Sequence, residues 1–189
     1  MDMERGRGPV IAVSGSPGSG KTTYARYLSE KLGLRFISGG KVFRELAREK
    51  GLSLIELNKL ASVDPRIDIE LEKKLLEEAM KGNVVIESHL AGWTLRGVAD
   101  VLIYVKASLK SRLERISKRE NRLIDDALME TSWREAIEAN RFLSLYAIDI
   151  TDLTHFDIVL DTTYLSEEEA KELLLSLTRA ILKKRLMTS

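Results

Sequence analysis

The sequence predicts an α/β domain with a five-stranded parallel sheet that is covered by helices on both faces. Five short apolar segments lack strict alternation with polar residues, which is typical of strands buried on both faces. Segments with helical spacing separate them, as in parallel sheets. A glycine-rich loop lies between the first predicted strand and the first predicted helix. The chain has 189 residues, 44% of them apolar, which suits one domain with one main core.

The glycine-rich loop at residues 15–22 has the pattern G-x-x-x-x-G-K-T of a P-loop. An apolar segment at 9–13 precedes it, and a helical pattern at 23–32 follows and ends at Gly33. This context favours a phosphate-binding loop over a turn that binds nothing. Backbone N–H groups and the start of the helix would hold the phosphates of ATP. The residues expected to bind ATP are Gly15, Ser16, Pro17, Gly18, Ser19, Gly20, Lys21, Thr22 and Thr23.

Two residues of this loop have separate expected roles. Lys21 would reach the β- and γ-phosphates of ATP, and the Thr22 hydroxyl would ligate Mg²⁺. The pattern therefore indicates a nucleoside triphosphate and a metal ion. It does not say what happens to the γ-phosphate.

A helical insertion is predicted after the second strand, which covers residues 34–37. One helix is expected at 41–50, and a second opens at a capping box that starts with Ser53. A third is expected to begin with Asp64 as its N-cap and Pro65 in its first turn. Its apolar stripe consists of Ile67, Leu71, Leu75 and Ala79.

The second half of the chain continues the alternation. Strands are predicted at 83–87, 100–105 and 156–160, with a loop at 88–93. Helices are predicted at 108–118 and 125–146. A capping box at Ser166 opens the last helix. Its expected buried stripe consists of Ala170, Leu173, Leu174, Leu177 and Ile181.

These elements predict one domain over residues 1–189. Its core would comprise 9–37, 81–118 and 147–189, with an insertion at 38–80 and a lid region at 115–134. The absence of cysteine excludes disulfides and thiol chemistry. With a net charge of +1 and no apolar run long enough for a bilayer, we expect a cytoplasmic protein that binds neither membrane nor nucleic acid.

Ligands of parallel sheets bind at the carboxyl ends of the strands, so polar residues there are candidates. Glu87 ends a predicted strand and could hold Mg²⁺, or it could point into solvent. Ser38 and Arg44 bracket the first inserted helix and could hold a second anionic substrate. His89 is expected to be a hydrogen-bonding group of a binding loop rather than a general base. Trp93, next to Gly92, could stack on a base or belong to the core.

Two groups of arginines are further candidates. Arg134, Glu138 and Arg141 have i, i+4, i+7 spacing, so they share one helix face, where an exposed ion pair is the simplest explanation. Arg115 and Arg119, together with Arg122, flank a break between two helices. They could form a basic surface or a lid that folds over phosphates.

Taken together, these motifs resemble nucleoside monophosphate kinases, most of all the archaeal type of cytidylate kinase. The P-loop is shared by many enzymes, whereas Leu-Ala-Gly-Trp at 90–93 and the arginine–glutamate–arginine spacing at 134–141 are more discriminating. The resemblance covers nearly the whole chain and implies the nucleoside monophosphate kinase fold, with strand order 2-3-1-4-5. It departs at His89, where relatives often have arginine.

The resemblance implies a role for each matching residue. Ser38 and Arg44 would bind the monophosphate, and Arg134 and Arg141 would bridge the two phosphates. Glu138 would reach the cytosine or orient those arginines. His89, Gly92 and Trp93 would belong to the nucleotide pocket, and Arg115 and Arg119 to the lid on the ATP side.

The implied reaction is transfer of the γ-phosphoryl group of ATP to CMP or dCMP, with Mg²⁺, in a monomeric enzyme. Adenylate kinase activity is the nearest alternative, because Ser-His-Leu at 88–90 resembles an adenylate-kinase-like group linked to ribosome assembly. An ATPase of that group is the second alternative. A nucleotide-dependent switch would need a guanine-binding signature that the sequence lacks.

Overall fold

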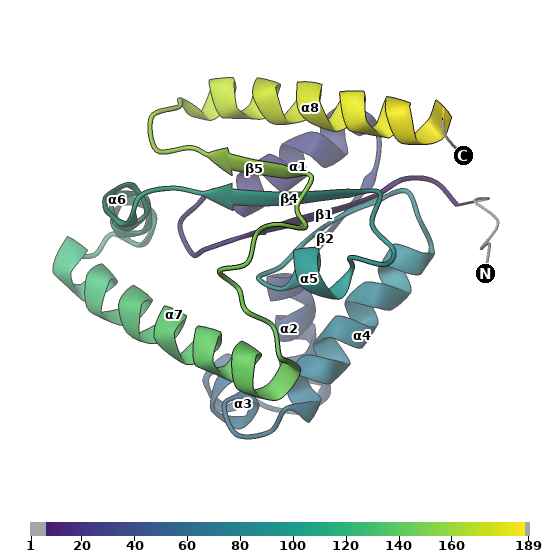
Figure 1. Cartoon of the computed structure of the whole chain (residues 1–189). Helices are drawn as coiled ribbons and strands as arrows, with labels where there is room; N and C mark the ends of the chain where they lie inside the picture. Colours follow the sequence, from purple (N-terminus) through teal and green to yellow (C-terminus); the bar gives the residue numbers. More distant parts are fainter. Residues whose placement is uncertain (1–6, 188–189) are drawn as a thin grey trace.

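The computed structural model describes residues 7–187, and its centre is one five-stranded parallel sheet in the order β2-β3-β1-β4-β5. The predicted fold class and strand order are confirmed (Figure 1). The strands are β1 (Val10–Gly15), β2 (Arg35–Ser38), β3 (Val84–Glu87), β4 (Val101–Lys106) and β5 (Ile158–Asp161). The helices are α1 (Lys21–Leu32), α2 (Gly39–Glu49), α3 (Leu54–Ala61), α4 (Arg66–Met80), α5 (Ala91–Thr94), α6 (Leu109–Glu120), α7 (Ile124–Tyr146) and α8 (Glu167–Met187).

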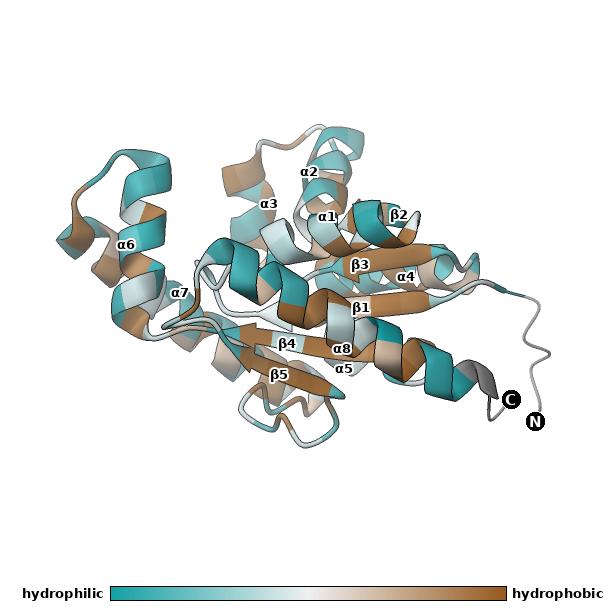
Figure 2. Cartoon of the chain, turned by 90° about the horizontal axis from the view of Figure 1, so that it is seen from above, coloured by the Kyte–Doolittle hydropathy of each residue, from teal (hydrophilic) through white to brown (hydrophobic). Residues whose placement is uncertain are grey.

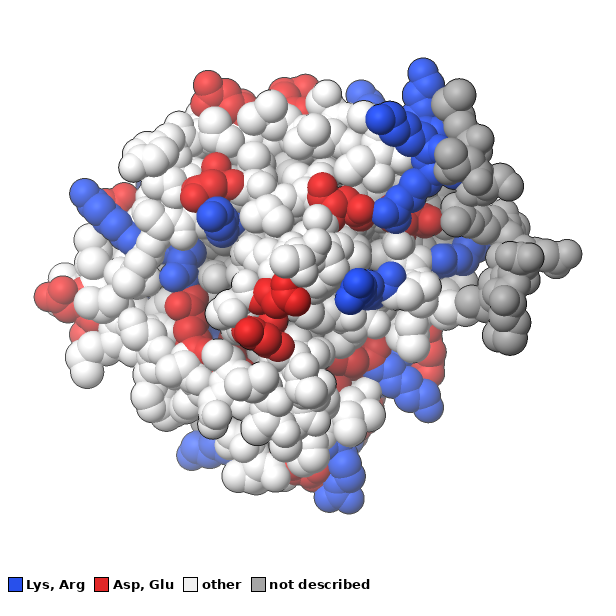
Figure 3. Space-filling view, viewed as in Figure 1, with Lys and Arg blue, Asp and Glu red and all other residues white. Residues whose placement is uncertain are grey.

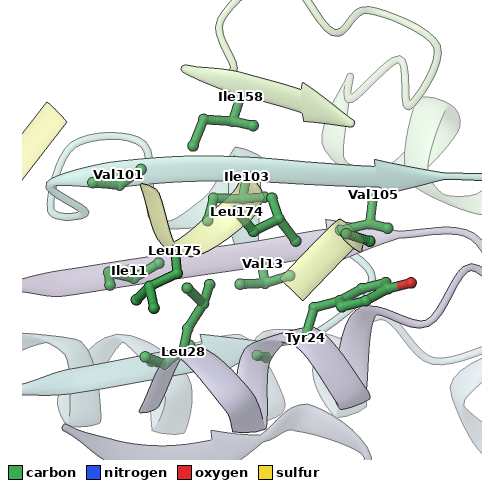
Figure 4. Close-up of a cluster of buried hydrophobic side chains, with 13 residues drawn as sticks. Ile11, Val13, Tyr24, Leu28, Val101, Ile103, Val105, Ile158, Leu174 and Leu175 are labelled. Atoms are coloured by element: carbon green, nitrogen blue, oxygen red, sulfur yellow. The ribbon is translucent and has the colours of Figure 1, made fainter. Parts of the chain in front are cut away.

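Each face of the sheet is covered by its own set of helices. On β1, Ile11 and Val13 belong to a cluster with α1 and α8, whereas Val10 and Ala12 belong to a cluster with α4 and α5. Successive residues of a strand point to opposite faces, so these residues enter the two clusters alternately. All four side chains are fully buried because helices cover both faces. Figure 4 shows the first cluster, in which Leu28 and Leu174 meet the strands. Figure 2 shows the apolar strands flanked by helices with polar outer surfaces.

Helices α2, α3 and α4 pack around a small core of their own that includes Leu46, Leu57 and Ile67. The predicted capping box at Ser53 is confirmed, since its hydroxyl accepts from the Glu56 backbone N–H at 3.2 Å. The predicted start of α4 is wrong by one residue, because Pro65 occupies the N-cap position.

Two further expectations are corrected. In α8, Leu173 and Leu177 are each 44% exposed, and Thr178 is buried in their place. The buried face is therefore centred on Ala170, Leu174 and Thr178, with i, i+4 spacing. The segment predicted as a loop at 88–93 contains the start of the one-turn helix α5.

The surface carries mixed charge. On the face seen in Figure 3, basic and acidic side chains are interspersed, in keeping with the net charge of +1. Within residues 7–187, none of the helices is both long enough and apolar enough to cross a membrane.

Candidate active site

A cavity of about 400 Å³ opens at the carboxyl ends of the strands, between the glycine-rich loop, the insertion α2–α4 and helix α7. It brings together residues that are far apart in the sequence. The predicted site residues that line it are Pro17, Gly18, Lys21, Thr22, Ser38, Arg44, Glu87, His89, Arg119, Arg134, Glu138 and Arg141.

The glycine-rich loop is held in a shape that larger residues would not permit. Gly18 has a φ of 77°, and a Cβ there would lie 2.7 Å from the backbone oxygen of Arg112. Arg112 is 8% exposed and donates to the Pro17 carbonyl oxygen at 3.0 Å. Its guanidinium also pairs with Glu135 of α7. The loop is therefore fastened to α6 and α7 before any ligand binds.

Beside this loop, β2 and β3 end in a hydrogen-bonded pair. Ser38 lies opposite Glu87 in the parallel register, and its hydroxyl donates to Glu87 Oε1 at 2.6 Å. Burial lowers the pKa of Lys21, and the negative charge of Glu87 opposes that shift. The carboxylate of Glu87 therefore lies near Lys21, and it is shielded from solvent, since Glu87 is only 4% exposed.

The oxygen atoms of Thr22 and Glu87 suit Mg²⁺, which prefers oxygen ligands and keeps several waters and phosphate oxygens. Among the described residues, no group of three or more His, Cys, Asp or Glu side chains is arranged to hold a metal ion, so waters and phosphate oxygens would have to supply the other ligands. A hydroxyl and one carboxylate therefore fit an ion that arrives with a nucleotide.

Helix α7 supplies two of the arginines in the cavity. Arg134 donates from Nε to Glu138 Oε1 at 2.9 Å. Arg141 Nε lies 3.2 Å from Asp68 Oδ2 of α4, so the ion pair joins α7 to the insertion. Both arginines line the cavity, and Arg134, whose side chain is half exposed, also forms the i, i+4 ion pair that its spacing allows.

His89 contacts the same glutamate, with Nδ1 3.3 Å from Glu138 Oε2. Burial lowers the pKa of His89 well below its usual value, and the positive charges of Lys21 and Arg134 lower it further. The imidazole is therefore neutral at pH 7. A neutral ring beside a carboxylate serves as a hydrogen-bond donor and carries no positive charge to a phosphate.

Of the residues predicted for the site outside the loop 15–23, three do not line this cavity, namely Gly92, Trp93 and Arg115; of the loop itself, only Pro17, Gly18, Lys21 and Thr22 line it. Arg115 donates to the Thr162 carbonyl oxygen at 3.0 Å and to the Ser19 oxygen at 3.3 Å, so it ties the loop to the end of β5. Trp93 packs edge-on against Phe156, with ring centroids 4.9 Å apart.

Gly92 lies against the same aromatic group. A Cβ at Gly92 would lie 2.1 Å from the Phe156 ring, so the glycine permits close packing there. Trp93 lines a second cavity of about 330 Å³, which His89 and Glu138 also line. The ring contacts of Trp93 match the core alternative, and its position on a nucleotide base stays a prediction.

Sequence reasoning missed acidic residues on the insertion. Asp68 and Glu72 of α4 both line the main cavity, one helical turn apart. Each directly follows a residue of the predicted apolar stripe, Ile67 or Leu71. The sequence signal that could have identified them is the position of each carboxylate beside the buried apolar stripe of this helix. Arg112, which fastens the loop, had no signal beyond a generally basic helix.

Comparison with known proteins identifies the family. Residues 14–132 match the family model described as an AAA domain. A curated cytidylate kinase of Staphylothermus marinus is 49% identical over 160 residues, which cover 85% of this chain and 90% of the relative. One from Pyrobaculum islandicum is 50% identical over 161 residues, covering 85% and 88%. The chain belongs to the cytidylate kinase family.

Solved structures place this member of the cytidylate kinase family in a wider fold group. Shikimate kinase from Bacteroides thetaiotaomicron superposes with a TM-score of 0.64 at 17% identity, covering 93% of this chain and 98% of that one. A gluconokinase from Sinorhizobium meliloti gives a TM-score of 0.62 at 15% identity, covering 96% and 98%. At these identities the likeness shows the fold alone.

Proposed function

We propose that the protein transfers the γ-phosphoryl group of ATP to CMP or dCMP. One observation carries the proposal: the glycine-rich loop and cationic side chains from four separate segments line one cavity. Those cations are Lys21 of α1, Arg44 of the insertion, Arg119 of α6, and Arg134 and Arg141 of α7. Membership of the cytidylate kinase family supports CMP as the acceptor.

The reaction needs positioning and charge rather than a general base, because the attacking phosphate oxygen is already an anion near pH 7. That oxygen forms a bond to the γ-phosphorus of ATP as the bond to the β-phosphate oxygen breaks, which gives CDP and ADP. Lys21 would hold the β- and γ-phosphates, and Arg44 the acceptor phosphate. Arg134 and Arg141 would neutralise the charge on the transferring group between them.

The loop residues 15–23 would bind ATP, and Thr22 and Glu87 would hold Mg²⁺, which neutralises phosphate charge when bound. Arg119 would approach from the lid at 115–134, and the insertion at 38–80 would close over the acceptor and exclude water. Ser38 and His89 would orient the acceptor through Glu87 and Glu138. We further propose a cytoplasmic monomer that acts on small nucleotides and has no nucleic acid partner.

The deciding experiment measures ADP formation from ATP and Mg²⁺ with CMP, dCMP, UMP, AMP or GMP, beside a blank without acceptor. Strong turnover with CMP or dCMP and little in the blank is the expected result. Preference for AMP would indicate an adenylate kinase. Equal ADP formation in every sample would indicate an ATPase and would refute the acceptor site.

A variant tests the arginines. Arg134→Ala should lower kcat by about 100-fold or more while the melting temperature changes little, because half of the side chain is exposed. Arg179→Ala on α8, outside the cavity, is the matched control. A near-normal kcat for Arg134→Ala would mean that the phosphates bind elsewhere.

A further inference from the structure

The wall of the main cavity formed by α4 differs from the wall that carries the arginines. Leu71 of α4 lines it, and Phe43 and Phe142 line it from the neighbouring helices α2 and α7. Such apolar side chains suit the flat faces of a base rather than a phosphate. Glu72, one residue beyond Leu71, is the polar group of interest on this wall.

Asp68 and Glu72 are one turn apart, yet their surroundings are different. Asp68 has a cationic partner in Arg141 and lies 3.3 Å from the Tyr146 hydroxyl. Glu72 receives a hydrogen bond from Thr94, whose hydroxyl lies 2.6 Å from Oε2. Burial raises the pKa of Glu72 to about 7. The hydrogen bond from Thr94 opposes this shift, and the negative charge of Asp68 adds to it. Among the described residues, no cation contributes to this pKa, so none balances the charge of the carboxylate.

Glu72 is partly buried, and Thr94 bonds only one of its two carboxyl oxygens. Thr94 engages Oε2, which leaves Oε1 as the acceptor that Glu72 can offer to a ligand in the cavity. The Thr94 hydroxyl also lies 3.1 Å from the Leu90 carbonyl oxygen, so α5 holds this arrangement in place.

An acceptor at this position distinguishes the two common pyrimidines. Cytosine carries a 4-amino group that donates, whereas uracil carries a 4-oxo group that only accepts. The ionised carboxylate, which predominates above the pKa of about 7, offers only acceptors. There an amino group would satisfy Oε1, while an oxo group would meet another acceptor and leave both without a partner. Sites built to bond a polar group discriminate strongly against analogues that lack it.

We propose that Glu72, anchored by Thr94, is the residue that binds the 4-amino group of cytosine and rejects uracil. This inference rests on the proposed function, since it assumes that the acceptor nucleotide occupies the cavity. It assigns base selection to α4, a helix for which the sequence patterns gave no such role.

The test is binding of nucleotides to the full-length protein by calorimetry, without turnover, at about pH 8, where Glu72 is ionised. The ligands are CMP, UMP and the 2-pyrimidinone ribonucleoside monophosphate, which is CMP without its amino group. The wild-type protein should bind CMP at least about 10-fold more tightly than either analogue. In Glu72→Gln, whose amide can donate to an oxo group, the preference for CMP over UMP should fall by about 10-fold or invert.

Glu77→Gln is the matched control, because Glu77 is an exposed residue of the same helix. It should keep the wild-type preference, and both variants should bind ATP normally, which verifies folding. The inference is overturned if Glu72→Gln retains the full preference, or if the wild-type protein binds CMP and its deaminated analogue equally. Equal binding of CMP and its deaminated analogue by the wild-type protein overturns the inference even if Glu72→Gln misfolds. If the protein binds CMP selectively but forms no ADP with it, the proposed reaction is refuted and the inference about Glu72 stands.

Discussion

Replacement of Glu138 by glutamine should separate catalysis from stability. Glu138 contacts two cavity residues, Arg134 at 2.9 Å and His89 at 3.3 Å. The change keeps the shape of the side chain but removes its charge and turns one oxygen into an NH₂ group, which repels one of the two partners. Arg134 then has at most a neutral amide oxygen in place of the charged acceptor that sets its orientation.

The structure sets the size of both effects. Arg134 is 51% exposed and pairs with Glu138 at i, i+4, so the pair contributes only about 0.5 kcal/mol to the free energy of unfolding. The melting temperature should therefore fall by no more than about 2 °C. A misdirected guanidinium at the transferring phosphate should lower kcat by about 10- to 100-fold.

The assay is steady-state ADP formation with CMP, together with thermal unfolding of the same preparations. Glu167→Gln is the control, since Glu167 forms an i, i+4 ion pair with Lys171 outside the cavity. It should change neither quantity beyond the small loss expected of an exposed pair. A Glu138→Gln variant with wild-type kcat would refute the claim that this glutamate orients Arg134.

Three further predictions concern single groups. Lys21→Ala should lower kcat by at least about 100-fold with unchanged secondary structure by circular dichroism, and substantial remaining turnover would contradict its phosphate role. Asp100→Ala should cost about 1–3 kcal/mol in urea unfolding, because Asp100 Oδ2 accepts from the Val10 N–H at 2.8 Å, and its kcat should stay normal. The pKa of Glu72 is about 7 in the folded chain against an ordinary 4.5, so its contribution to stability falls as the pH rises between those values. Glu72→Gln should therefore gain about 2–3 kcal/mol relative to wild type between pH 5 and pH 8 in urea unfolding, and a gain independent of pH would contradict the shift.

The parts of the fold that follow local rules were predictable from the sequence. The glycine pattern, the apolar strands and the Ser53 capping box depend on neighbouring residues, and each appears where expected. The buried face of α8 was not predictable in detail. Leu173 and Leu177 have the apolar character of core residues, but the sheet accepts only the face that carries Leu174 and Thr178.

The candidate site shows the same division. The spacing on α7 correctly indicates that Arg134, Glu138 and Arg141 share a face, but the direction of that face depends on how α7 packs. Arg115 and Arg119 lie in the same basic helix, and the sequence does not distinguish them. The structure does, because Arg115 bonds Ser19 and Thr162 and so supports the glycine-rich loop instead of lining the cavity. Pairing between distant segments is information that spacing along the chain does not hold.

The pairing of β3 with its two neighbours has a consequence for how this gene can change. Glu87 lies opposite Val13 of β1 and Ser38 of β2. Inserting or deleting one residue within β3 would turn Glu87 to the other face of the sheet and leave an apolar residue in the cavity. The same change near Gly51 or Gly97, where a Cβ would meet open space, would displace nothing in the cavity. Length variation among viable descendants of this chain should therefore accumulate at those turns and be absent from β3.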